Sequence, residues 1–348
     1  MSRNSFILGC KSARWIIVCI IKDARSNRGR MSRLILTLVA ALLFAGAASG
    51  ADWGKERPIC TVADSAQEQP AIDGHIVTWA DNRSGNYDIF MYDLETGLER
   101  WVCVNPFIQV HPSVSGERIV WQDMRSGKAD IYMYDAVSRT ESVVANGKGN
   151  KTQPSISGDR VVWADDRNGN SNIYMYDLAT RKETRISSGP KDQLAPRISG
   201  DKIVWMDQRS GHWNIYMYDA SSGTESPLSA SPTDQSFPSI NGNTVAWSDN
   251  SSGHPNIAIY DLSNKSLNHL TKPGSQTTPA VYGDYVAYEN NGTEVWLYDI
   301  KTKKDFQLVA GSIKLEPAIG ERGVVWTDFR RGPKDPDIFV VIICSASN

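Results

Sequence analysis

One stretch recurs along the chain and constrains the fold more than any other feature. Its third copy begins at Pro154 and reads PSISGDRVVWADDRNGNSNIYMYD. A fixed period of about 40 residues that holds several short strands is typical of radial or stacked β-repeats. The copies begin at seven prolines, the first five of them 42 residues apart: Pro70, Pro112, Pro154, Pro196, Pro238, Pro279 and Pro317.

Each repeat is expected to hold four strands. In the third copy we place them at 154–157, 160–164, 172–177 and 184–187, because turn-forming or polar residues separate these apolar runs. The second strand carries one large aromatic residue in every copy, which predicts a side chain that fills the gap between neighbouring sheets. These aromatics are Trp79, Trp121, Trp163, Trp205, Trp247, Tyr288 and Trp326.

The two ends of the chain complement each other. The seventh copy stops too early for a fourth strand, whereas residues 57–62 precede Pro70 as a fourth strand would. The sequence therefore predicts an all-β fold over residues 52–348, a seven-bladed β-propeller of four-stranded antiparallel blades. In it the N-terminal strand completes the last blade, which protects an open edge; six blades and a stray segment are the alternative. We expect Cys60 to face Val340, which leaves a Cys60–Cys344 disulfide out of register.

The N-terminal segment has the pattern of an export signal. A short segment at 31–33 with the charged residue Arg33 precedes an apolar run at 34–48 that ends in small residues. Residues 31–51 are therefore predicted to be a signal peptide, with Met31 as the start, and 1–30 an upstream extension without a fold. The expected location is extracellular or at the cell surface, with no membrane span after cleavage. An uncleaved membrane anchor is the alternative.

Composition narrows the function. The net charge of -2 offers no basic excess for nucleic acid. The five histidines occupy unrelated repeat positions and the cysteines have no regular spacing, so we predict no metal site, no cofactor and no disulfide framework. The chain has no nucleophile-elbow motif, and no catalytic residue is assigned. A monomer is expected.

The repeat resembles a known family. Its pattern P-x-x-S-G-x-x-I-V-W-x-D-x-R-x-G-N-x-D-I-Y-x-Y-D is similar to the TolB-type, WD-like β-propeller repeat, most of all to versions in cell-surface proteins of methanogenic archaea. The resemblance covers roughly residues 56–343. It implies a binding platform in the cell envelope, a gating domain of a peptidase, or in some cases a lyase.

Candidate site residues lie in the loop after the second strand and in the crossings between blades. Five blades repeat an Asp–Arg pair there, and His111, His212 and Trp213 depart from the repeat. These pairs form either a two-signed rim for sugars or a peptide, or a structural device that caps the turn and ties neighbouring blades together. The loop oxygens also have calcium-loop spacing, but an arginine at the third position opposes a cation. The pairs are Asp81/Arg83, Asp123/Arg125, Asp165/Arg167, Asp207/Arg209 and Asp328/Arg330.

Two functions follow from these features. The first is a secreted or cell-surface, non-catalytic propeller that binds an envelope protein or a polysaccharide through its loop face. The alternative is a carbohydrate-active lyase or hydrolase with acidic residues at the mouth of the central channel. A binding platform is expected to have a nearly symmetric rim, and an enzyme a pocket where three or more non-repeat polar residues converge.

Overall fold

The computed structural model describes residues 52–344, and regular secondary structure in that range is entirely β. The predicted extension (1–30) and signal peptide (31–51) lie outside the described residues. Within the described range no helix has the length and apolar character needed to cross a membrane.

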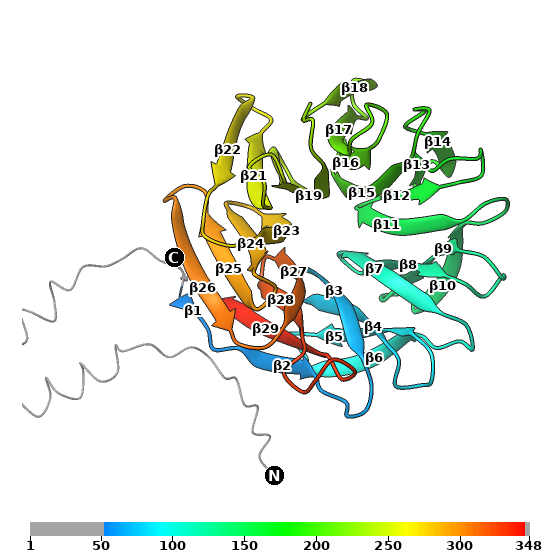
Figure 1. The fold of residues 1–348 in the computed structure, drawn as a ribbon. Helices are drawn as coiled ribbons and strands as arrows, with labels where there is room; N and C mark the ends of the chain where they lie inside the picture. The colour runs from blue at the N-terminus through cyan, green and yellow to red at the C-terminus, as the bar shows by residue number, and fades with distance from the viewer. Residues whose placement is uncertain (1–51, 345–348) are drawn as a thin grey trace, which may run out of the picture. The chain divides into compact units, whose positions relative to one another are not determined.

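Seven antiparallel sheets succeed one another around a central channel, which confirms the predicted seven-bladed propeller (Figure 1). In the first six blades the four strands pair in chain order, and the first strand lies nearest the channel. Blade 1 consists of β3 (Gln67–Asp73), β4 (Ile76–Asp81), β5 (Asp88–Asp93) and β6 (Leu98–Cys103). Blade 2 consists of β7 (Gln109–Ser115), β8 (Arg118–Asp123), β9 (Asp130–Asp135) and β10 (Thr140–Ala145). Blade 3 consists of β11 (Lys151–Ser157), β12 (Arg160–Asp165), β13 (Asn172–Asp177) and β14 (Lys182–Arg185). The next three are β15 (Gln193–Ser199), β16 (Lys202–Asp207), β17 (Asn214–Asp219) and β18 (Thr224–Pro227), then β19 (Gln235–Asn241), β20 (Thr244–Asp249), β21 (Asn256–Asp261) and β22 (Ser266–Leu270), then β23 (Gln276–Tyr282), β24 (Tyr285–Asn290), β25 (Glu294–Asp299) and β26 (Lys304–Ala310).

The seventh blade joins the two ends of the propeller, as predicted. Its strands β27 (Lys314–Gly320), β28 (Gly323–Asp328) and β29 (Asp337–Cys344) come from the C-terminal end, and β2 (Arg57–Cys60) pairs with β29; β1 (Asp52–Trp53) belongs to the same sheet. Cys60 lies opposite Ile338, so the predicted pairing with Val340 is wrong by two residues. The register at Cys60 is instead that of a complete blade: in blade 3 the equivalent Ile186 donates its backbone N–H to the carbonyl of Ile173 (2.8 Å), which is the equivalent of Ile338. Cys60 is buried and free.

The core consists of apolar clusters that each span two neighbouring blades. One of them joins Val120 and Ile131 of blade 2 to Val161 and Trp163 of blade 3. Each of the seven predicted aromatics is at most 1% exposed, which confirms their role between the sheets. Truncating such a side chain to alanine costs about 3–5 kcal/mol, so the aromatic layer is a principal source of stability.

In blade 3 the strand bounds differ from the prediction by more than one residue in two places. The first strand of blade 3 begins at Lys151 rather than at Pro154, and it contains a register shift between Thr152 and Ser155. The proline cannot donate to the ladder, so the strand accommodates it in a bulge instead of starting at it. The fourth strand is 182–185 rather than 184–187. The bulge places the residue before the proline on the lining of the channel.

Candidate functional site

In each of the five blades the predicted Asp–Arg pair joins a fully buried aspartate to a partly exposed arginine. In blade 3, Asp165 is fully buried and accepts hydrogen bonds from the indole N–H of Trp163 (3.1 Å) and the backbone N–H of Arg167 (3.0 Å). The guanidinium Nη2 lies 2.5 Å from the carboxylate. Burial alone would raise the pKa of Asp165, but the hydrogen bonds from Arg167 outweigh it and hold the pKa below its usual value. The carboxylates therefore lie beneath the loop face.

Each arginine mainly links the strands of its own blade. Arg167 Nη1 is 2.7 Å from Glu183 on the fourth strand, and its guanidinium stacks 4.4 Å from the ring centre of Tyr174 on the third. Among the described contacts of these five arginines, only those of Arg83 and Arg125 also reach the preceding blade, where they donate to the thiols of Cys60 and Cys103. The idea that every arginine ties neighbouring blades together is therefore wrong for most of the pairs.

The three remaining predicted residues separate. His111 lines the central channel. His212 is exposed in the loop of blade 4, where its Nδ1 lies 3.6 Å from Asp234. Trp213 follows it in the same loop, where its backbone N–H donates to Asp234. Neither His212 nor Trp213 contributes to the cavity that His111 lines.

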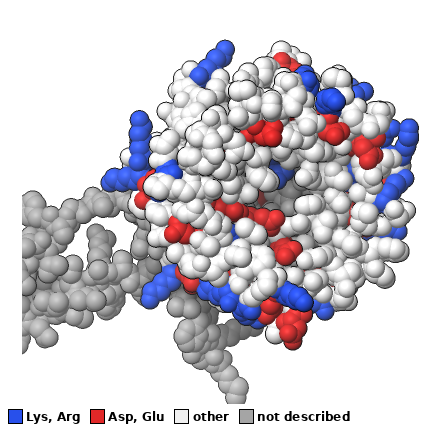
Figure 2. Space-filling model, in the orientation of Figure 1, with Lys and Arg blue, Asp and Glu red and all other residues white. Residues whose placement is uncertain are grey.

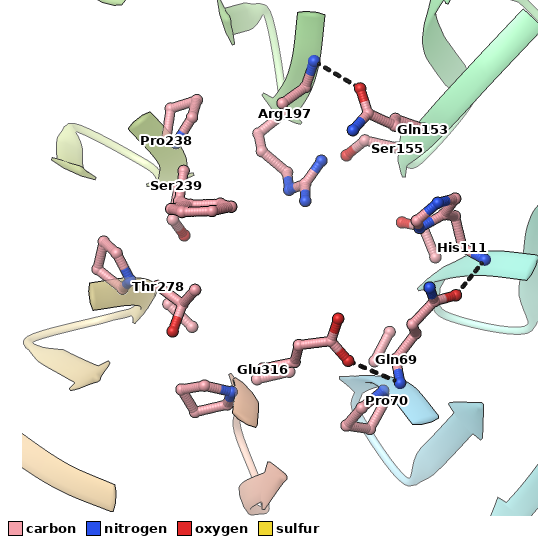
Figure 3. Close-up of a pocket in the computed structure, with 18 of the residues that line it drawn as sticks. Gln69, Pro70, His111, Gln153, Ser155, Arg197, Pro238, Ser239, Thr278 and Glu316 are labelled. Carbon is pink, nitrogen blue, oxygen red and sulfur yellow. Dashed lines mark hydrogen bonds between the residues drawn. The ribbon is translucent and has the colours of Figure 1, made fainter. Parts of the chain in front are cut away.

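The central channel opens into a cavity of about 780 Å³ that all seven blades line (Figure 3). In every blade the residue before the conserved proline adopts a left-handed conformation, with φ between 46° and 58°. A non-glycine residue pays about 1–2 kcal/mol for this conformation. Because the bulge is common to all blades, it is a property of the repeat, and what varies is the side chain it presents: Gln69, His111, Gln153, Ala195, Phe237, Thr278 and Glu316.

Hydrogen bonds connect this ring from blade to blade. The carboxylate of Glu316 accepts the backbone N–H of Gln69 (2.9 Å), and the side-chain oxygen of Gln69 accepts the N–H of His111 (2.8 Å). In the same way Gln153 accepts the N–H of Ala195 (2.9 Å). Long polar side chains in the ring therefore both line the channel and fix the relative position of adjacent blades.

The charged groups of the cavity titrate abnormally. Displacement of water raises the pKa of Glu316 to about 7, and the neighbouring carboxylates of Glu68 and Glu289 add to this effect. Burial lowers the pKa of His111, and the positive charge of Arg197 lowers it further. An acid that titrates near neutrality, a neutral imidazole and a guanidinium thus line one cavity. Such a combination is common at functional sites.

Sequence reasoning missed most of this site. It identified His111 but not Arg197, Glu289 or Glu316, because it took the rim loops as the functional surface. A signal was nevertheless present. The position before the proline holds six different residue types in seven copies, whereas the proline itself never changes.

The cavity has no metal-binding arrangement. Across residues 52–344 no three histidine, cysteine or acidic side chains lie together in a way that could hold a metal ion. Blade 5 has Asp249 at the position of the paired aspartates but no arginine two residues later. There the imidazole of His269 lies 2.9 Å from Asp249.

Comparisons with known proteins agree with this architecture. A family model described as the TolB beta propeller domain (PD40) matches residues 66–284. No curated protein sequence matches the chain. Among solved structures, TolB from Acinetobacter baumannii is 22% identical with a TM-score of 0.51; the match covers 67% of this chain and 62% of that TolB, so the chain spans less than two thirds of its length.

Two further structures resemble the fold more completely. An oligogalacturonate lyase in complex with manganese is 10% identical with a TM-score of 0.64, over 85% of this chain and 97% of the lyase. The β-propeller domain of the Trilobed protease from Pyrococcus furiosus is 13% identical with a TM-score of 0.65, over 82% of this chain and 99% of that domain. At these identities the likeness establishes the fold alone.

Proposed function

The chain belongs to the TolB beta propeller domain family, and from that premise we propose that it is an exported, envelope-associated propeller that binds one polar ligand in its central channel. The ligand is a segment of an envelope protein or a polysaccharide. The export signal predicted at residues 31–51 supports the location, and the similarity to cell-surface propellers of methanogenic archaea stays a prediction.

One observation carries this proposal: the repeats differ in sequence at the positions whose side chains enter the channel. The Asp–Arg pairs, the aromatic layer and the prolines recur with little change, as structural residues do. The ring of left-handed residues carries amide, imidazole, methyl, phenyl, hydroxyl and carboxylate groups at equivalent positions. A site for a single ligand needs such asymmetry, and a cavity of about 780 Å³ is of the usual size for one.

A paired array experiment tests the proposal. Residues 52–348 are applied to glycan and peptide arrays, alongside the double variant His111→Ala, Phe237→Ala. Alanine occurs naturally at the equivalent Ala195, so the bulge tolerates it. We expect the double variant to lose binding, and His212→Ala in the outer loop to retain it. The opposite result would place the ligand on the rim.

The second candidate function is a carbohydrate-active lyase or hydrolase. It is favoured by Glu316, whose pKa of about 7 suits a general acid or base, and by the convergence of His111, Arg197 and Glu316 in one cavity. Incubation with a panel of acidic and neutral oligosaccharides tests it. Turnover that disappears in Glu316→Gln while the variant stays folded supports the enzyme, and absence of turnover leaves the binding function.

A further inference from the structure

The charges in the channel are separated by sign. Arg197 projects from β15 of blade 4, and Glu316 projects from β27 of blade 7 on the opposite side (Figure 3). Glu289 of β24 and Glu68 of β3 lie close enough to Glu316 to raise its pKa. Figure 2 shows acidic atoms gathered along one side of the central hollow, with a basic side chain on the other. The channel is therefore bipolar.

Arg197, the cation of the channel, is not in contact with a carboxylate of the described residues. Within residues 52–344 Arg197 forms no ion pair, and its Nη1 donates only to the carbonyl oxygen of Pro196 (2.9 Å). Glu316 attracts Arg197 across the channel but lies beyond ion-pair distance. The guanidinium therefore keeps donors free for an anion, and a carboxylate matches its planar geometry best.

The acidic side likewise lacks a cation. Glu289 accepts the backbone N–H of Glu316 (2.6 Å), and Glu68 accepts the hydroxyl of Tyr87 (2.9 Å). No lysine or arginine of the described range forms an ion pair with Glu68, Glu289 or Glu316. Neighbouring carboxylates of one sign repel each other, so an ammonium group placed among them would be stabilised.

Both ends of this arrangement depart from the repeat. The position of Arg197 is alanine or serine in the other six blades, and the position of Glu289 is never acidic elsewhere: Ala80, Gln122, Ala164, Met206, Ser248 and Thr327. The fold does not need these charges, because the other blades close without them. They point to a ligand that carries both signs.

We propose that the channel binds a small zwitterion, with a carboxylate on Arg197 and an ammonium group held by Glu316 and Glu289. An amino acid or a short peptide with free ends has this chemistry. The inference rests on the proposed channel site and replaces its polymer ligand with a small molecule of the peptide class. A sugar acid would supply only the anion.

Calorimetry with four probes tests the inference: the dipeptide Ala-Ala, its N-acetylated form, its C-terminal amide, and a galacturonate dimer. We expect the dipeptide to bind, and each capped form to bind at least about ten-fold more weakly, the loss of one charged contact. Arg197→Ser, which restores the residue of blades 2, 3 and 5, should remove the preference for a free carboxylate. Glu316→Gln should remove the preference for a free amine.

The control is Arg322→Ser, a change at an exposed arginine paired with Glu95 outside the channel, and it should leave every affinity unchanged. Equal binding of the capped and free dipeptides, or no binding of the dipeptide, overturns the inference. If the galacturonate dimer binds more tightly than the dipeptide and depends on Arg197, the zwitterion is wrong but the channel site stands. Array binding that ignores the channel variants would instead refute the proposed function itself.

Discussion

Arg330 of the last blade forms a bidentate ion pair with Glu56 of the N-terminal segment, at 2.8 and 3.1 Å. In blades 1 to 4 the equivalent arginine binds a glutamate on the fourth strand of its own blade, as Arg125 binds Glu141 at 2.6 Å. Residues 274 positions apart thus reproduce a contact that is local elsewhere. The N-terminal strand replaces the missing fourth strand in chemistry as well as in position.

Glu56→Ala and Glu141→Ala are expected to destabilise the protein equally. Both glutamates are about one-third exposed, so each loss should cost about 0.5–1 kcal/mol in urea unfolding. A cost for Glu141→Ala but none for Glu56→Ala would mean that the closing strand does not hold this geometry in solution.

Arg167→Ala is expected to destabilise the domain by about 2–4 kcal/mol. The change leaves the fully buried Asp165 without its cation, and removal of one partner of such a pair is costly. Lys191→Ala, at an exposed position in the crossing from blade 3 to blade 4, should have little effect. Thermal unfolding measures both. An unchanged melting temperature with impaired ligand binding would indicate that the Asp–Arg pairs bind the ligand.

The sequence predicted the blades better than the site, for a physical reason. Turn chemistry, strand periodicity and the aromatic layer act locally and repeat, so the seven blades and their closure could be read from spacing. The register at Cys60 could not, because β2 pairs with β29 across the closure of the ring and no hairpin loop fixes the offset of the two strands. The placement of Arg197 and Glu316 on opposite sides of one channel could not be predicted either, since blades 4 and 7 face each other only when the ring closes.

The contribution of Glu316 to the stability of the domain should decrease as the pH rises from about 4.5 to about 7. Glu316 has a folded-state pKa of about 7, above the ordinary glutamate value of 4.5, so the folded protein binds more protons at this residue than the unfolded chain in this window. The stability that Glu316 contributes is therefore greatest at the acidic end of this window, and it is lost as the pH rises through the folded-state pKa of this residue. The difference between wild type and Glu316→Gln isolates this residue from Asp337, whose pKa is raised to about 6. Parallel pH profiles for the two proteins would refute the assignment.

Cys60 and Cys103 should resist thiol reagents while the protein is folded. Burial raises the pKa of both thiols to about 12, and Glu99 and Glu141 add to the effect. At pH 8 only about one thiol in ten thousand is then ionised, and the thiolate is the reactive species. Ellman titration of Cys344→Ser, starting at Asp52, should detect both thiols only after denaturation. Rapid reaction of the folded protein with the reagent would contradict the burial of these two thiols.

The central claim is that the ligand lies in the channel and not on the rim of Asp–Arg pairs. The most direct measurement is the dissociation constant of an array-identified ligand for Arg197→Ser and for Arg167→Lys, each compared with wild type by calorimetry. The channel account predicts that Arg197→Ser weakens binding at least about ten-fold while Arg167→Lys leaves it within about two-fold, once both proteins are shown to be folded. Loss of binding in Arg167→Lys with full affinity in Arg197→Ser would contradict it.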